Sequence, residues 1–203
     1  MKTRLISLLC SFLLVTGCQT TEVLNVWSDD SQGEQFSDVL VIAILKESAY
    51  RNIVEQRLVE VLQAQGVEAE SASILYPQEG PMDQDIVDGM VARSSADSVM
   101  IVRLVDARKE TVYTPGTTYV PGGYGGRYSM GYYGYYGGGY TVMSTPGYST
   151  EYNISTVETT LFSTATNKRV WSTITETTET SVSKAIDSYI KVIGKSISES
   201  GLF

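Results

Sequence analysis

The groups in this chain that could do chemistry are two cysteines, carboxylates, lysines and tyrosines, because its 203 residues include no histidine. Without histidine there is no Ser-His-Asp triad and no Cys-His pair. Cys10 lies within an apolar run near the start, and Cys18 follows Thr16 and Gly17. Two cysteines alone cannot build a zinc site of the usual Cys/His type. We therefore expect no catalytic residues, no metal and no cofactor.

Residues 1–17 have the layout of an export signal. Lys2 and Arg4 form a charged start, an apolar run extends from Leu5 to Val15, and small residues precede Cys18. The run is too short to cross a bilayer, which takes about 20 residues. We predict that residues 1–17 are a signal peptide that is removed before Cys18, together with Cys10.

The four residues Val15-Thr16-Gly17-Cys18 resemble a lipobox, the motif at which bacterial lipoproteins are processed. The resemblance implies that the Cys18 thiol carries a diacylglyceryl group, and a multiply acylated cysteine anchors a protein stably in a membrane. It also leaves no thiol for catalysis or for a disulfide. The alternative is an ordinary signal peptide that ends near a cysteine. Gln19 stands where many inner-membrane lipoproteins have Asp, so the resemblance favours the outer membrane and its periplasmic face.

The net charge of the chain limits the kinds of partner that it can bind. The chain has 15 Lys and Arg against 23 Asp and Glu, a net charge of −8, and the signal takes two of the cations with it. Such a surface repels phosphate backbones. We expect no nucleic-acid partner.

Residues 18–37 are polar and predict a tether that lifts a single domain, residues 38–203, away from the membrane. Trp27 interrupts this tether and indicates either packing back onto the domain or a short edge strand. The apolar run Asp38–Leu45 predicts a strand buried on both faces. A helix is expected from a cap at Ser48 to a stop at Gly66.

On that helix Ile53, Val54, Leu58, Val61 and Leu62 form the predicted apolar face, and Glu55, Arg57, Glu60 and Gln63 the wet face. The other expected elements are a strand at 67–73, a helix at 83–94, a strand at 98–112, a hairpin of 150–163 with 170–178, and a helix at 183–198.

The order β-α-β-α-β, long loop, β-β-α predicts the α/β (α+β) class. We expect a mixed sheet flanked by about three helices, with the late hairpin antiparallel.

Residues 113–148 form the most unusual segment, with ten of the fourteen tyrosines, eleven of the eighteen glycines and Arg127 as the only charge. Tyrosines on a flexible backbone give large, adaptable contact surfaces. We predict a partner-binding loop here, and the alternative is an extension without a partner. The candidate binding residues are Tyr119, Tyr124, Arg127, Tyr128, Tyr132, Tyr133, Tyr135, Tyr136 and Tyr140.

The acidic residues give weaker signals. Asp83, Asp85 and Asp88 before Gly89 lack the spacing of a calcium loop and are better explained as acids at a helix start. Asp97 and Asp106 flank a strand that contains Arg103 inside its apolar half. A charged side chain there must find a partner or extend outward to solvent, so a structural ion pair or a strand-edge position is favoured over a catalytic role.

Several stretches together resemble a family of Gram-negative lipoproteins of unassigned activity, which also carry a Tyr/Gly/Pro-rich insertion. They are Trp27, the 38–45 run with the helix start at 48–51, the segments 96–99 and 103–106, and Val170-Trp171. The element order is similar to the α/β domain at the amino terminus of TolB and in curli-secretion-type lipoproteins. These resemblances imply envelope assembly or export partners.

The leading hypothesis is a non-enzymatic outer-membrane lipoprotein whose loop binds another envelope protein or peptidoglycan. A second hypothesis is a structural subunit of an envelope secretion complex that oligomerises through the loop hairpin. A third is a carbohydrate-binding module or an enzyme that uses tyrosines and carboxylates.

Overall fold

The computed structural model describes residues 20–29, 35–77, 84–119 and 143–203. It divides into two compact units. The first unit contains the chain up to Arg108 and again from Asn153 to Phe203, and the second is the segment Lys109–Tyr152.

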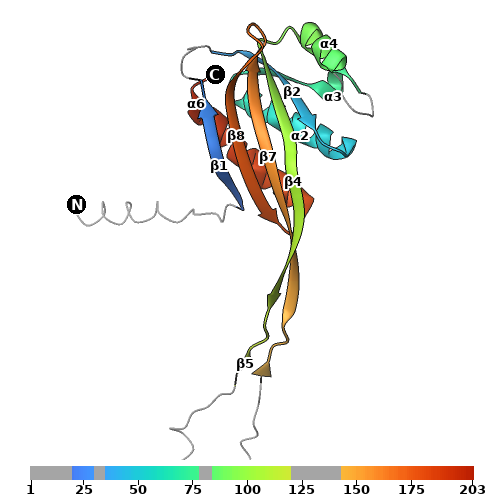
Figure 1. Ribbon diagram of the computed structural model, residues 1–203, viewed down its shortest axis with the longest axis vertical. Coiled ribbons are helices and arrows are strands. Elements are labelled where there is room, and N and C mark those ends of the chain that lie inside the picture. Colours follow the sequence, from blue (N-terminus) through green and yellow to red (C-terminus); the bar gives the residue numbers. More distant parts are fainter. Residues whose placement is uncertain (1–19, 30–34, 78–83, 120–142) are drawn as a thin grey trace, which may run out of the picture. The chain divides into compact units, whose positions relative to one another are not determined.

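The first unit is built on a six-stranded mixed sheet with the strand order β1-β8-β7-β4-β2-β3 (Figure 1). β2 pairs in parallel with β3 and with β4, while β8 pairs antiparallel with β1 and with β7. The sheet therefore confirms the predicted α/β class with a mixed sheet. The strands are β1 (Thr21–Ser28), β2 (Asp38–Ile44), β3 (Glu68–Ser71), β4 (Ser98–Thr114), β7 (Tyr148–Ser163) and β8 (Lys168–Glu179).

Four helices are present in the described residues, one more than expected. They are α2 (Ser48–Ala64), α3 (Ala72–Leu75), α4 (Gln84–Ser94) and α6 (Val182–Ser200). The short helix α3 was missed, because the predicted strand at 67–73 ends at Ser71 and the chain turns into a single helical turn. No helix of the described part of the chain is both long enough and apolar enough to cross a membrane.

Two apolar cores lie on opposite faces of the sheet, because successive strand residues point to opposite sides. Val39 and Val41 join the core formed with α2 and α6. Leu40 and Ile42 join a smaller core with α3 and α4. β2 is thus buried on both faces, as its continuous apolar run predicted.

The ends of α2 follow backbone geometry more than side-chain capping. Its N-cap is Glu47, which makes no side-chain capping bond, so the predicted cap at Ser48 is wrong. The predicted stop is confirmed: Gly66 has φ +86°, a left-handed conformation that other residues rarely adopt.

Glu55 of α2 was expected on the wet face, and this is also wrong. Its side chain is fully buried (0% exposed). The carboxylate accepts hydrogen bonds from the backbone N–H of Ala43 (2.9 Å), the Ser71 hydroxyl (2.8 Å) and the backbone N–H of Ser73 (2.8 Å). These three hydrogen bonds compensate the carboxylate for the contacts with water that it loses on burial.

The predicted tether at 18–37 differs from the structure, because residues 21–28 form β1 at the edge of the sheet. Of the two explanations that Trp27 left open, the edge strand is the one observed. Its partner β8 lies about 150 residues away in the chain, as in the pairing of Thr21 with Thr177.

The second unit is a two-stranded hairpin arm, defined here as the described residues of Lys109–Tyr152. It contains the end of β4, the beginning of β7, and the short antiparallel pair β5 (Thr118–Tyr119) and β6 (Met143–Ser144). The strand predicted at 98–112 agrees with β4, which continues to Thr114.

Candidate functional site

The hairpin arm exposes both of its faces. Residues 109–117 and 144–149 are all exposed, without the alternation of buried and exposed residues seen in a strand that covers a core. Val112, Tyr113 and Tyr148 are large hydrophobic side chains of the arm, and they are 45%, 64% and 61% exposed. A two-stranded hairpin alone is marginally stable in water.

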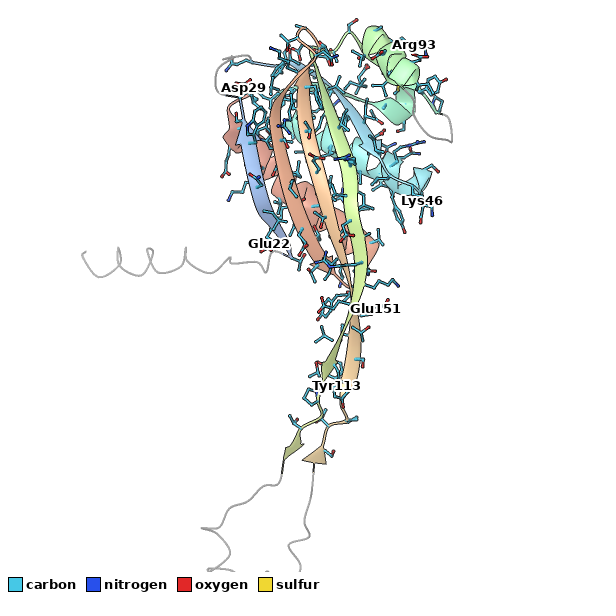
Figure 2. All side chains as sticks on the ribbon, viewed as in Figure 1. Glu22, Asp29, Lys46, Arg93, Tyr113 and Glu151 are labelled. Carbon is cyan, nitrogen blue, oxygen red and sulfur yellow. The ribbon has the colours of Figure 1, made fainter. Side chains whose placement is uncertain are left out.

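Local contacts keep the arm in register. Lys109 of β4 forms an ion pair with Glu151 of β7 at an N–O distance of 2.7 Å. Figure 2 labels Glu151 and Tyr113. The N–H of Thr145 donates to the carbonyl of Thr117 at 2.9 Å. The Tyr113 side chain lies directly against Gly147, where an added Cβ would be 2.4 Å from the tyrosine hydroxyl oxygen. The arm is therefore an ordered strand pair that ends in the described β5–β6 ladder.

The predicted binding residues lie almost entirely beyond the described residues. Tyr119 belongs to β5, where it pairs with Met143. The other eight are outside the described residues: Tyr124, Arg127, Tyr128, Tyr132, Tyr133, Tyr135, Tyr136 and Tyr140. Tyr113 and Tyr148, which the loop prediction did not single out, are the exposed tyrosines that the structure does place on the arm.

Cys18 and the signal peptide also lie outside the described residues, and the lipidation of Cys18 stays a prediction. The nearest described position is Thr20, whose hydroxyl donates to the Glu179 carboxylate (2.8 Å) and to the Ser188 hydroxyl (3.0 Å). The chain that leads to Cys18 therefore leaves from a point fixed to the first unit.

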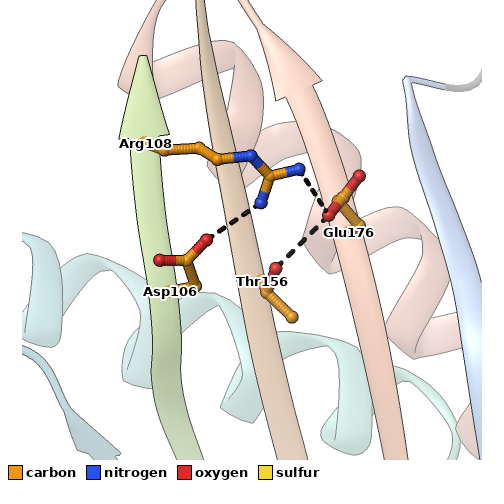
Figure 3. Close-up of polar contacts among 4 residues, drawn as sticks. All are labelled: Asp106, Arg108, Thr156 and Glu176. Carbon is orange, nitrogen blue, oxygen red and sulfur yellow. Dashed lines mark hydrogen bonds and ion pairs between the residues drawn. The ribbon is translucent and has the colours of Figure 1, made fainter. Parts of the chain in front are cut away.

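A network of charged side chains lies on the sheet face opposite α6 (Figure 3). Arg108 donates to Asp106 at 2.9 Å and to Glu176 at 3.1 Å, and Glu176 also accepts a 3.5 Å bond from Thr156. The hydrogen bonds to Asp106 and then to Glu176 raise the pKa of Arg108 above its ordinary value. Arg108 is therefore a permanent cation, which cannot serve as a proton carrier.

Arg103 pairs with Glu158 of β7, and its own side chain is 58% exposed. The structural ion pair expected for Arg103 is confirmed, and its partner is neither Asp97 nor Asp106. Asp97 instead accepts bonds from the Ser37 N–H (2.8 Å), the Ser37 hydroxyl (2.9 Å) and the Asp38 N–H (3.2 Å). An exposed ion pair such as that of Arg103 with Glu158 contributes little to stability.

A shallow acidic groove of about 440 Å³ lies at the β3 edge of the sheet. Asp38, Glu68 and Glu70 contribute its carboxylates. Burial, followed by the negative charges of Asp97, Glu68 and Glu70, raises the pKa of Asp38. No sequence signal marked this groove, because Asp38 meets β3 only through parallel strand pairing.

The described residues hold no group of three or more His, Cys, Asp or Glu side chains that could bind a metal ion. Asp85 lies in the first turn of α4, which agrees with its interpretation as an acid at a helix start. Asp83, by contrast, is outside the described residues.

Comparisons with known proteins find no matching family model and no matching curated protein. Among solved structures, the PelC dodecamer from Paraburkholderia phytofirmans is 13% identical, with 86% of this chain and 95% of that chain covered and a TM-score of 0.45. The lipoprotein GNA1162 from Neisseria meningitidis is 11% identical, with 81% and 99% covered and a TM-score of 0.42. A PDZ domain protein from Parabacteroides distasonis is 10% identical, with 94% and 38% covered and a TM-score of 0.37.

Proposed function

We propose that this protein is a non-enzymatic, lipid-anchored protein of the bacterial envelope, whose hairpin arm binds another envelope component. The anchor is the lipid on Cys18, in the outer membrane and facing the periplasm. The binding surface is the exposed ribbon around Tyr113 and Tyr148, together with the Tyr/Gly-rich segment that it carries.

The observation that carries the binding proposal is the exposure of both faces of the arm. A ribbon that covers no core of its own contributes little to the fold, yet it displays Val112 and two tyrosines to solvent. Tyrosine contributes apolar area and a hydroxyl at low cost in conformational entropy, which suits it to binding surfaces. The arm is therefore better suited to binding a partner than to stabilising the fold.

The chemistry available on the chain supports a non-enzymatic role. The chain contains no histidine. Charged side chains of β4, β7 and β8 are engaged in ion pairs: Arg103 pairs with Glu158, and Arg108 pairs with both Asp106 and Glu176. Side chains engaged in such ion pairs provide no activated nucleophile or base.

Photo-crosslinking in intact envelopes tests the binding proposal. A photoreactive amino acid is placed at Tyr113 or Tyr148 on the arm, and at Ile74 of α3, which is 68% exposed, as the matched control. We expect adducts of defined mass from both arm positions and none of these from Ile74. Adducts that collapse on muramidase digestion identify peptidoglycan as the partner, whereas adducts at twice the chain mass identify a second copy. Identical patterns at all three positions, or no adduct from the arm, would falsify the proposal.

Mass analysis of the mature protein tests the anchor separately. A diacylglyceryl mass on an N-terminal Cys18 is expected, together with release of the Cys18→Ser variant from the membrane fraction. An unmodified Cys18 in the membrane-bound protein contradicts the anchor and leaves the crosslinking result to be judged by itself.

A further inference from the structure

β1 carries a band of exposed apolar side chains at the edge of the sheet. Val23, Leu24, Val26 and Trp27 are 41%, 53%, 51% and 40% exposed. They occupy four of the eight positions of this strand, whereas β3, the opposite edge strand, exposes Glu68 and Glu70. Because successive strand residues point to opposite faces of a sheet, such side chains flank the outer edge of the strand on both sides. Large apolar side chains exposed along an edge in this way indicate a contact site. We call this band the β1 edge.

A bulge on β1 disfavours the addition of another strand there. The register of β1 against β8 shifts between Val23 and Asn25, and Leu24 has no partner in the pairing. A bulge bends and twists an edge strand, and proteins use this device to prevent strand addition. The occupant of the β1 edge is therefore not expected to be a β-strand of another chain.

The proposed anchor lies very close to the same strand. Thr21 lies three positions after Cys18 in the chain, a span of at most about 11 Å even when fully extended. Thr21 is itself fixed, because its hydroxyl bonds to Thr177 (2.8 Å) and to Ser188 of α6 (2.7 Å). The start of β1 must then lie at the bilayer surface whenever Cys18 is inserted in the membrane.

The far end of β1 carries the residue types that favour a membrane interface. The guanidinium of Arg169 lies 4.3 Å from the centre of the Trp27 ring. Lys168 and Arg169 are both exposed at the start of β8. Tryptophan concentrates at the level of the lipid headgroups, and a basic side chain beside it can contact lipid phosphates.

We propose that the β1 edge lies along the bilayer interface as a second membrane contact, so that the lipid on Cys18 and the strand together fix the orientation of the first unit. This inference rests on the lipid anchor of the proposed function. Trp27 follows Thr21 by six residues, or about 20 Å of strand. It reaches the membrane only if the strand lies along the surface, and a strand standing upright would hold Trp27 in water.

The unpaired backbone of an edge strand limits the depth of the contact. Its N–H and C=O groups need water or headgroups as partners, and the hydrocarbon core supplies neither. The side chains therefore enter the headgroup region while the backbone stays at the interface.

Tryptophan fluorescence of the full, acylated chain tests the proposal, because the chain has only two tryptophans and Trp171 is buried at 2% exposure. The protein is reconstituted into vesicles of phosphatidylethanolamine and phosphatidylglycerol that contain phosphatidylcholine brominated either near the headgroup or near the chain end. We expect quenching that is stronger for bromine near the headgroup and that is lost in Trp27→Phe.

An orientation control uses Trp27→Phe with Ile74→Trp, which moves the exposed tryptophan to α3 beside the opposite edge of the sheet. This tryptophan should not be quenched. The variant Leu24→Glu/Val26→Glu, at two exposed positions, should lower the quenching of Trp27.

The failures of the two proposals are distinguishable in this experiment. If mass analysis shows an acylated Cys18 but Trp27 is unquenched, or the tryptophan at position 74 is quenched equally, the β1 contact is overturned and the anchor stands. If Cys18 is unmodified and the protein does not float with the vesicles, both are overturned.

Discussion

The carboxylate of Glu55 in α2 accepts a hydrogen bond from the backbone N–H of Ala43 in β2, and neither group is exposed to solvent. The same carboxylate binds the Ser71 hydroxyl and the Ser73 N–H, where β3 passes into α3. One side chain thus joins the helix α2, the strand β2 and the turn from β3 into α3.

Replacement of Glu55 should therefore lower the free energy of unfolding more than the replacement of an exposed helix residue would. Glu55→Ala leaves the buried N–H of Ala43, the partly buried N–H of Ser73 and the Ser71 hydroxyl without this acceptor. We expect the free energy of unfolding to fall by about 3 kcal/mol. Urea denaturation measures the loss. The matched control is Glu60→Gln on the exposed side of the same helix, expected within about 0.5 kcal/mol of the wild type. Equal effects of the two variants would contradict the structural role of Glu55.

The sequence predicted well those elements in which the spacing of apolar residues reflects which faces are buried. β2 is a run of apolar residues because both of its faces are covered, and α6 repeats Ile186, Ile190, Ile193 and Ile197 along the face that packs on the sheet. The β7–β8 hairpin was also confirmed, because Thr, Val and aromatic residues flank a short turn.

The positions that the pattern missed depend on contacts between distant segments. Glu55 lies between Val54 and Leu58 on the buried stripe, so its spacing was a usable signal, but a charged residue is usually assigned to solvent. β1 has no clear alternation and becomes a strand by pairing with β8. The acidic groove at Asp38 likewise depends on the parallel pairing of β2 with β3.

Gly194 of α6 should be sensitive to substitution because it faces Val61 of α2. A Cβ at position 194 would lie 2.8 Å from Cγ1 of Val61, a stiff β-branched side chain. We expect Gly194→Ala to lower the free energy of unfolding by about 1 kcal/mol through overpacking, despite its better helix propensity.

Three further variants check that explanation. Val61→Ala should make room, so that adding Gly194→Ala to it is neutral or stabilising. Gly89→Ala in α4, where an added Cβ meets nothing within 4 Å, should stabilise the protein by about 0.5–1 kcal/mol. Thermal unfolding of the wild type and these four variants gives the comparison, and a destabilised Gly89→Ala would argue against close packing as the cause.

Asp38 should make stability depend on pH with a defined sign. Burial and three neighbouring acids raise its pKa in the folded state, so the folded protein binds the proton more tightly than the unfolded chain. Stability therefore falls as the pH rises from about 3.8, the unfolded value, through the raised pKa, and stays lowered above it.

Asp38→Asn removes the charge that is disfavoured at neutral pH. We expect this variant to be more stable than the wild type at pH 7 by about 0.5 kcal/mol, the scale of a partly exposed charge interaction. The difference should vanish below the unfolded pKa, where both states of the wild type are protonated. Denaturation midpoints across the pH range measure it, and a less stable Asp38→Asn at neutral pH would contradict the assignment.

The contact of Tyr113 with Gly147 should decide whether the hairpin arm keeps its register. An added Cβ at position 147 would lie 2.4 Å from the Tyr113 hydroxyl oxygen and 2.8 Å from Cζ, so Gly147→Ala must displace the ring. We expect faster hydrogen exchange at the Thr145 amide, whose N–H donates to the Thr117 carbonyl across the arm. The Thr178 amide in the first unit should keep its protection, and Tyr113→Ser should restore that of Thr145 in Gly147→Ala. An arm whose exchange is unchanged by Gly147→Ala does not depend on this contact, and its strands would then be held by their backbone pairing alone.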